Sequence, residues 1–272
     1  MKVILSRKGF DSQYGGYPSP ILPDGKMISL PIPGKSSLRY SDLKVNDMLT
    51  YYDLIQQLGI RTVNEQTTCH VDPDICHEIL DRPIGWKPAF GQVDAAEGHL
   101  RNQGVNEGDL FIFFGRFCKT KYNDEKYAFC PDKNHDFHAL FGYLQIGRIL
   151  RNNNFPSWLN THPHANEEHL SNPTNTIYVA SDQLSWDSHI PGAGKFIFNH
   201  ELQLTRNNTK NISEWNLPVD IFRDAQISYH PNPWKNGFFK SADKGQEFVI
   251  QDNDTVVEWA KNIISGGIEY NL

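Results

Sequence analysis

The chain has 272 residues, 39% of them hydrophobic, with a formal net charge of −6 and a mean hydropathy of −0.54. These values suit a globular protein with a substantial core, and no apolar window reaches the length of a membrane-spanning helix. The negative charge disfavours tight nonspecific binding to nucleic acid, because a duplex-binding domain presents a basic face to the phosphates. A local basic groove stays compatible with this charge, and its candidate residues are Arg101, Arg116, Lys119 and Lys121.

No stretch rich in proline, glycine and serine and no run of like charge divides the chain, so we expect one domain over residues 1–272. The first residues turn polar after three apolar ones and lack the core of a signal peptide, which predicts a cytoplasmic location. The four cysteines form no C-x-x-C pair, which argues against a zinc ribbon and favours free thiols.

The chain opens with a predicted strand at Lys2–Ser6, followed by a loop at residues 9–16 that has glycines at both ends. Such a loop can bring its backbone close to a ligand. The carboxylate of Asp11 at the tip of the loop is therefore a candidate catalytic group. A purely structural turn is the alternative interpretation.

Three further elements are predicted before residue 64. An Asp-Gly turn at residues 24 and 25 indicates a hairpin. The apolar spacing of residues 46–58 predicts an amphipathic helix that Gly59 ends. Residues 60–63 are expected to begin another strand.

The segment Thr68–Asp74 concentrates residues suited to metal binding. His70 and Asp72 stand two residues apart, so on a strand both side chains point to the same side. With a second histidine from elsewhere they form the two-histidine, one-carboxylate set of non-haem iron(II) enzymes, which leaves open positions for oxygen and substrate. An ordinary Asp-Pro-Asp turn is the alternative.

Two later segments supply further histidines. His138 opens the apolar run 138–149, where a buried imidazole needs a hydrogen-bonding partner or a metal ion. In His162-Pro-His164 the proline stiffens the spacing of two imidazoles, which as plain loop residues would have no special role. We predict a divalent metal ion, iron(II) in the first place, held by His70, Asp72, His138 and His164. The histidines in polar stretches are predicted to face solvent, namely His77, His135, His169 and His189.

Residues 90–117 change from a helical to a strand pattern without a long linker. Residues 93–102 favour a helix that Gly104 ends, and the aromatic run 110–114 predicts a strand buried on both faces. We expect this strand and the run 138–149 to form the centre of one sheet.

The predicted helix at residues 93–102 carries a second group of candidates. His99 and Gln103 are four residues apart and can face one pocket together with Gln92, and amide side chains can read the edge of a base. A capped surface helix is the alternative. We assign His99 and Gln103 as catalytic candidates, and the substrate-binding candidates are Gln92, Arg101, Asn102 and Arg116.

The C-terminal third is predicted to be rich in strands, at residues 175–180 and 195–198. A closing helix is predicted at residues 253–264.

Six segments, in chain order, resemble the bacterial and phage family called nucleotide modification associated domain 3. They are KVILSRKGFDSQYGGYPSPILPDG, TCHVDPD, GQVDAAEGHLRNQGVNEGDLFIFFGRF, HALFGYLQIGRIL, HPHA and NTIYVASDQL. The resemblance covers nearly the whole chain. It implies a substrate among nucleobases, nucleotides or DNA, and the residues leave an amino-acid side chain of a peptide open as well.

We predict an α+β fold with a mixed, partly barrel-like sheet and a few flanking helices. The turn at residues 106–109 and the strands around it loosely resemble the core of PUA-like barrels, which bind modified nucleic acids. The first functional hypothesis is a metal-dependent tailoring enzyme, oxidative or hydrolytic, that acts on a nucleotide, nucleic acid or peptide. The second is a PUA-like module that reads modified nucleic acid without catalysis. The oligomeric state is left open.

Overall fold

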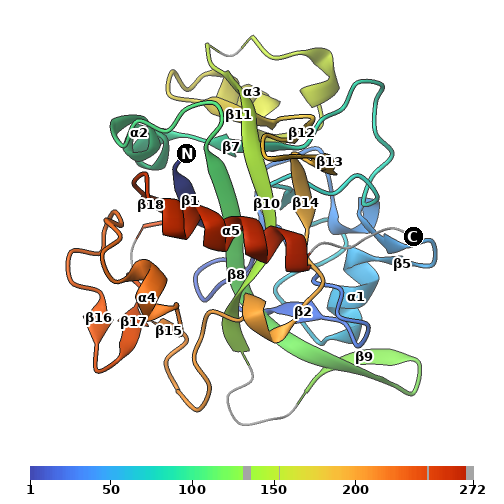
Figure 1. Cartoon of the computed structure of the whole chain (residues 1–272). Helices are drawn as coiled ribbons and strands as arrows, with labels where there is room; N and C mark the ends of the chain where they lie inside the picture. The colour runs from blue at the N-terminus through green and yellow to red at the C-terminus, as the bar shows by residue number, and fades with distance from the viewer. Residues whose placement is uncertain (131–135, 153, 244, 268–272) are drawn as a thin grey trace.

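The computed structural model describes residues 1–130, 136–152, 154–243 and 245–267 (Figure 1). Its centre is a nine-stranded mixed sheet, and the main path of this sheet runs in the order β18, β1, β8, β10, β11, β7. These strands are β18 (Glu247–Ile250), β1 (Val3–Arg7), β8 (Leu110–Asn123), β10 (Asp136–Leu150), β11 (Thr176–Ala180) and β7 (Ala89–Gln92). Three more strands join the sides of this path, namely β2 (Ser19–Ile21), β9 (Lys126–Phe129) and β14 (Ala193–Lys195).

Short elements surround the sheet. The helices are α1 (Tyr51–Gln57), α2 (Asp94–Asn102), α3 (Glu167–Leu170), α4 (Val219–Phe222) and α5 (Asp254–Gly267), with 3-10 turns η1 (Tyr40–Asp42), η2 (Ser157–Leu159), η3 (Pro163–Ala165) and η4 (His200–Leu202). Small sheets pair β3 (Ile32–Pro33) with β6 (Cys69–His70), β4 (Lys44–Asn46) with β5 (Leu49–Thr50), and β12 (Gln183–Leu184) with β13 (Asp187–Pro191). A further, three-stranded sheet joins β15 (Glu214–Trp215), β17 (Phe238–Lys240) and β16 (Trp234–Lys235).

The long strands β8 and β10 are buried on both faces, as the unbroken apolar runs predicted. In β8, Ile112 and Phe114 belong to the core under α5, which crosses one face of the sheet in Figure 1. Phe111 and Phe113 belong to the core on the opposite face. Parallel pairing of β1 with β8 and antiparallel pairing of β8 with β10 make the sheet mixed.

Three expectations about the fold need correction. The described residues form no closed barrel, so the expected barrel-like, PUA-like core is not confirmed. The helix expected at residues 46–58 starts only at Tyr51, because residues 44–50 form the β4–β5 hairpin and Thr50 caps the helix by accepting a hydrogen bond from the Asp53 backbone N–H. Residues 60–63 form no strand.

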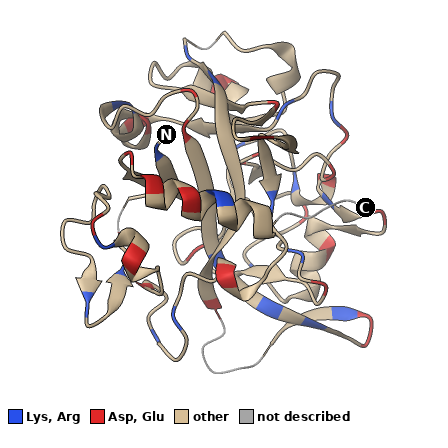
Figure 2. Ribbon diagram, in the orientation of Figure 1, with Lys and Arg blue, Asp and Glu red and all other residues tan. Residues whose placement is uncertain are grey.

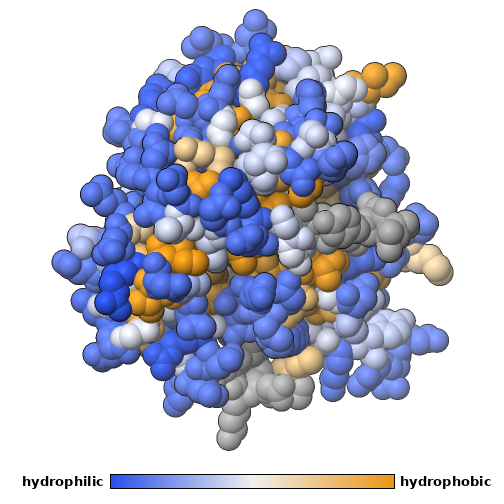
Figure 3. All heavy atoms as spheres, in the orientation of Figure 1, coloured by the Kyte–Doolittle hydropathy of each residue, from blue (hydrophilic) through white to orange (hydrophobic). Residues whose placement is uncertain are grey.

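Charged residues of both signs are interspersed along the chain (Figure 2). Hydrophilic side chains cover most of the face shown in Figure 3, and hydrophobic ones appear among them in small patches. The four residues proposed for a basic groove do not line one groove. Arg101 lies on α2, whereas Lys119 and Lys121 lie at the far end of β8, and Arg116 is paired with Asp136 (Figure 1). None of the described helices is long and apolar enough to cross a membrane.

Candidate metal centre

Three histidines from separate short elements converge beside the edge strand β7. His70 ends β6, His164 lies in η3 and His169 lies in α3. Their candidate ligand atoms all lie within 4.8 Å of one another. Three nitrogens that share one ion at the usual metal–nitrogen distance lie roughly 3.0–3.6 Å apart. Binding one ion would therefore draw the three rings together by up to about an ångström.

A carboxylate, that of Asp72, lies beside His164 at the edge of this three-histidine group. The Asp72 side chain is 6% exposed, and Oδ2 lies 3.8 Å from His164 Nε2. The backbone N–H of Gly91 in β7 donates to Asp72 Oδ1 at 2.8 Å, which fixes the carboxylate against the sheet. Burial alone would raise the pKa of Asp72, but the adjacent imidazoles of His162, His164 and His70 outweigh it and lower the pKa. Asp72 is thus an anion at neutral pH.

The local sequence explains how the two later histidines are held. Asn166 is the N-cap of α3, because its Oδ1 accepts a hydrogen bond from the His169 backbone N–H at 3.1 Å. The same Oδ1 lies 3.0 Å from His169 Nδ1. His164 Nδ1 lies 2.9 Å from Asn175 Oδ1, and Asn175 Nδ2 donates to the His164 carbonyl oxygen at 2.8 Å.

An amide oxygen only accepts hydrogen bonds, so His164 and His169 carry their protons on Nδ1. The lone pair of each ring is then on Nε2. Hydrogen bonding of the second ring nitrogen to an amide or carbonyl oxygen is the usual way in which metal-ligating histidines are oriented.

The charge state of the rings also suits a metal ion. Burial lowers the pKa of His70 to about 4 and that of His164 to about 3, and burial likewise lowers the pKa of His169. These imidazoles are therefore neutral at pH 7, which is the form that binds metals.

Gly91 leaves the space that the ring of His164 occupies. A Cβ atom at position 91 would lie 2.2 Å from Cγ and Cδ2 of His164, closer than any real contact. The pairing of Gly91 with Ile177 places this glycine in the middle of β7. β7 therefore contributes a backbone donor for Asp72 and the space for His164.

His162 supports the cluster from behind. Its ring is 2% exposed, and its Nδ1 accepts a hydrogen bond from the His164 backbone N–H at 3.2 Å. The ring proton is therefore on Nε2, which lies 3.6 Å from Asp72 Oδ1 and has no hydrogen-bond partner among the described residues. The Nε2–H of His162 thus lies beside the carboxylate without a hydrogen bond to it.

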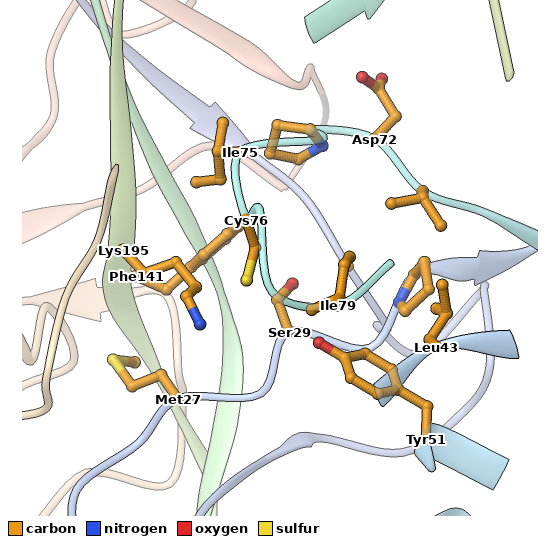
Figure 4. A pocket seen from close by; sticks show the side chains of 14 residues that line it. Met27, Ser29, Leu43, Tyr51, Asp72, Ile75, Cys76, Ile79, Phe141 and Lys195 are labelled. Atoms are coloured by element: carbon orange, nitrogen blue, oxygen red, sulfur yellow. The ribbon is translucent and has the colours of Figure 1, made fainter. Parts of the chain in front are cut away.

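The cluster lies in the wall of a cavity of about 430 Å³, which is within the range of small-molecule sites. The residues that line it are Arg7, Lys8, Gly9, Asp11, Gln13, Tyr14, Ile32, His70, Asp72, Gln92, Val93, His164, His169, Asp243, Gly245 and Gln246. A second cavity of about 40 Å³ lies on the other side of the segment that contains Asp72. Figure 4 shows Lys195, Cys76 and Tyr51 around that cavity, with the Asp72 carboxylate pointing away from them. The second cavity has room for little more than water.

Five of the predicted site residues line the large cavity, namely Asp11, His70, Asp72, Gln92 and His164. Asp11 Oδ1 accepts hydrogen bonds from the backbone N–H groups of Gln13 and Tyr14 at 2.7 and 2.8 Å, so one of its oxygens shapes the loop. Gln92 donates to the buried carboxylate of Glu247 at 2.6 Å.

The structure does not bring His138 to the metal-binding cluster. The ring of His138 packs edge-on against Phe114 and Trp215, in the core that α5 covers. Its Nδ1 accepts a hydrogen bond from Trp215 Nε1 at 3.0 Å. Of the two partners considered for this buried imidazole, a hydrogen-bonding side chain is the one found.

The candidates on α2 and at its C-terminal end lie outside the cavity lining, unlike Gln92 in β7. His99 Nε2 lies 2.9 Å from Ser228 Oγ and its ring lies against Tyr229, whereas Gln103 accepts a hydrogen bond from Gln251 at 2.8 Å. The remaining three substrate-binding candidates are Arg101, which pairs with Glu97, Arg116, which pairs with Asp136, and the exposed Asn102.

His169 corrects the expectation that it faces solvent, since it is half-buried and belongs to the cluster. The sequence signal for it was the Asn166 cap three residues earlier, which sets the direction of the helix and of the ring. Lys8 and Gly91 were missed as well, and only their tertiary neighbours reveal them. His77 and His189 are exposed as predicted, and His135 lies outside the described residues.

A family model described as nucleotide modification associated domain 3 matches residues 2–251, and this description implies a role in nucleotide modification. No curated protein and no solved structure matches the chain significantly. Because the match spans most of the 272 residues, the chain belongs to the nucleotide modification associated domain 3 family.

Proposed function

We propose that the protein is a metal-dependent enzyme that modifies a nucleotide or a nucleotide-related substrate. The observation that carries the proposal is the convergence of His70, His164 and His169 with the Asp72 carboxylate in the wall of a cavity of about 430 Å³. The family description supports the substrate class. Neither the cavity nor the family description favours the peptide substrate that the sequence left open.

The donor set suits a divalent transition metal. Imidazole ligands favour zinc, iron, nickel and copper over magnesium or calcium, and three imidazoles with one carboxylate leave open positions in a six-coordinate ion. We keep iron(II) as the first choice. A bound ion would supply Lewis acidity, and in the case of iron also redox chemistry with oxygen.

The chain's own residues prepare this site. Asn175 and Asn166 hold the rings of His164 and His169 so that their Nε2 lone pairs are presented. Gly91 and His162 hold the Asp72 carboxylate. The cavity side of the cluster stays open to a substrate, whose polar edge would meet Gln13, Gln92 and Gln246.

The first test is the metal content of protein purified without a chelating affinity tag, followed by titration of the stripped protein with Fe²⁺, Zn²⁺ and Mn²⁺ in a calorimeter. We expect one ion per chain. His164→Ala should lose this binding, whereas His189→Ala, which replaces an exposed histidine away from the cluster, should keep it.

A protein that binds none of these ions would refute the proposal. If such a protein bound modified oligonucleotides, the module without catalysis would be the better description. The reaction is then sought by mass spectrometry of nucleotides and DNA incubated with the loaded protein.

A further inference from the structure

A buried lysine lies in the same cavity as the candidate metal centre. Lys8 directly follows β1, and its side chain is 8% exposed. Its Nζ lies 2.8 Å from Glu247 Oε1 and 4.4 Å from the centre of the Phe90 ring. Gln92 Nε2 donates to the same Glu247 oxygen at 2.6 Å. Lys8 and Gln92 both line the cavity, whereas Glu247 lies behind them.

The ammonium group retains a donor for a ligand. It carries three N–H groups, of which the Glu247 carboxylate takes one and the face of Phe90 covers another. The Lys8 charge also acts on one of the metal-binding rings. Burial is the main cause of the low pKa of His70, and the Lys8 charge is among the groups that lower this pKa further.

A purely structural role explains this ion pair poorly. A buried ion pair contributes little to stability compared with apolar side chains of the same size, unless hydrogen bonds satisfy all its polar atoms. Here Glu247 is 1% exposed and its Oε2 has no hydrogen-bond partner among the described residues. With one oxygen unsatisfied, the pair contributes little to stability, and a role in the cavity accounts for its presence.

The other charges of the cavity do not neutralise Lys8. The carboxylates of Asp11 and Asp243 act on Arg7, whose pKa burial lowers and these two charges raise. Arg7 itself donates to the backbone carbonyl of Ala242 at 2.8 Å. Asp72 is held by Gly91 and the histidines.

We infer that Lys8 is a substrate-binding residue that donates a hydrogen bond to a substrate oxygen beside the metal ion. The substrate class is then one whose reacting part carries an oxygen that is negative or becomes negative during the reaction. Glu247 is a positioning residue, because it acts through Lys8, and Gln92 donates to the same Glu247 oxygen. This inference rests on the proposed metal site.

The test uses the full chain loaded with Co²⁺, with acetate as the probe anion and the visible absorption of the cobalt ion as the signal. The variant Lys8→Met/Glu247→Gln removes both buried charges at nearly constant volume, so that no carboxylate is left unpaired in the core. Lys87→Met is the matched control, because Lys87 is an exposed lysine with its own carboxylate partner, Asp182, at 2.6 Å.

We expect the dissociation constant of acetate to rise about tenfold or more in the double variant, as for the loss of a charge-assisted hydrogen bond. It should not change in Lys87→Met, and Lys8→Arg should keep most of the affinity. Equal acetate affinity in the double variant and in the original protein, with Co²⁺ bound in both, would overturn the inference. Failure of the original protein to bind Co²⁺ would instead refute the metal site on which the inference rests.

Discussion

Replacement of Gly91 by alanine tests the candidate metal centre through a residue that is not itself a ligand. The added Cβ would lie 2.2 Å from two ring carbons of His164 and 2.7 Å from its Nδ1. Carbon atoms in favourable contact are about 3.5 Å apart, so the ring must move by roughly 1.3 Å or the strand must shift by the same distance.

A movement of this size exceeds what a metal site tolerates. Ligand distances in such sites hold to within about 0.2 Å, so the displaced ring of His164 no longer reaches the ion. Loss of an orienting contact alone costs about 10- to 100-fold in metal affinity. We therefore expect Gly91→Ala to lower the affinity by about 100-fold or more, which corresponds to roughly 2.7 kcal/mol.

The assay is calorimetric titration with Zn²⁺, combined with urea unfolding of the metal-free protein. Gly98→Ala is the matched control, because Gly98 lies in α2 and a Cβ there meets nothing within 4 Å. An alanine inside a helix is more favourable than a glycine by about 1 kcal/mol, so this control should keep its metal affinity and gain stability.

A double variant separates the contact with His164 from general damage to β7. Overpacking costs about 1–3 kcal/mol, and removing the ring in Gly91→Ala/His164→Ala should return most of this loss if the clash is its source. A folded Gly91→Ala variant that binds Zn²⁺ as tightly as the original protein would show that His164 is not a metal ligand in the position described.

Three further predictions concern single side chains. Asp72→Asn keeps the size of the side chain and removes its charge, so bound metal should fall in elemental analysis, while the exposed His77→Ala should not change it. Asn166→Ser keeps the helix cap but is too short to reach His169 Nδ1, so metal affinity should fall about tenfold at unchanged thermal stability. Burial lowers the pKa of His138 to about 3, so the unfolded chain binds more protons between pH 3 and 6.5 and stability falls as the pH drops below 6.5. Urea unfolding at pH 7 and pH 5 should show that His138→Leu removes about 2 kcal/mol of this acid-induced loss; an unchanged loss would contradict the assignment.

The sequence predicted the centre of the sheet well, because its evidence is local. Strand β10 needed no partner to be recognised, since its apolar run is too long to lie on a surface. The expected barrel-like closure of the sheet is not confirmed, for the opposite reason. Whether strands close into a barrel depends on pairings such as β1 with β18, which joins residues 3–6 to residues 247–250 and has no signature in either segment.

The prediction of the candidate site was likewise limited to relations between residues that are close in the sequence. His70 and Asp72 were grouped because their spacing is local, and both line the cavity. His138 was grouped with them because every buried imidazole needs a partner, and the partner that decides its role, Trp215, lies 77 residues away. His169 was predicted to face solvent because its neighbours in the sequence are polar. The four-residue helix α3 sets the direction of its ring, and the polarity of the neighbours carries no information about that direction.

The arrangement of acceptors in the cluster gives the strongest reason to prefer a metal ion over a network of hydrogen bonds. The Nε2 lone pair of His164 faces Asp72 Oδ2 across 3.8 Å, and both atoms are acceptors. Two buried acceptors that face each other are unfavourable unless a proton or a cation lies between them. Burial lowers the pKa of His164 to about 3, so a proton is not available there at neutral pH. A cation between them would satisfy both atoms at once, where water from the cavity could only donate to them, and His169, whose Nε2 is also presented as an acceptor, would add a third ligand for it.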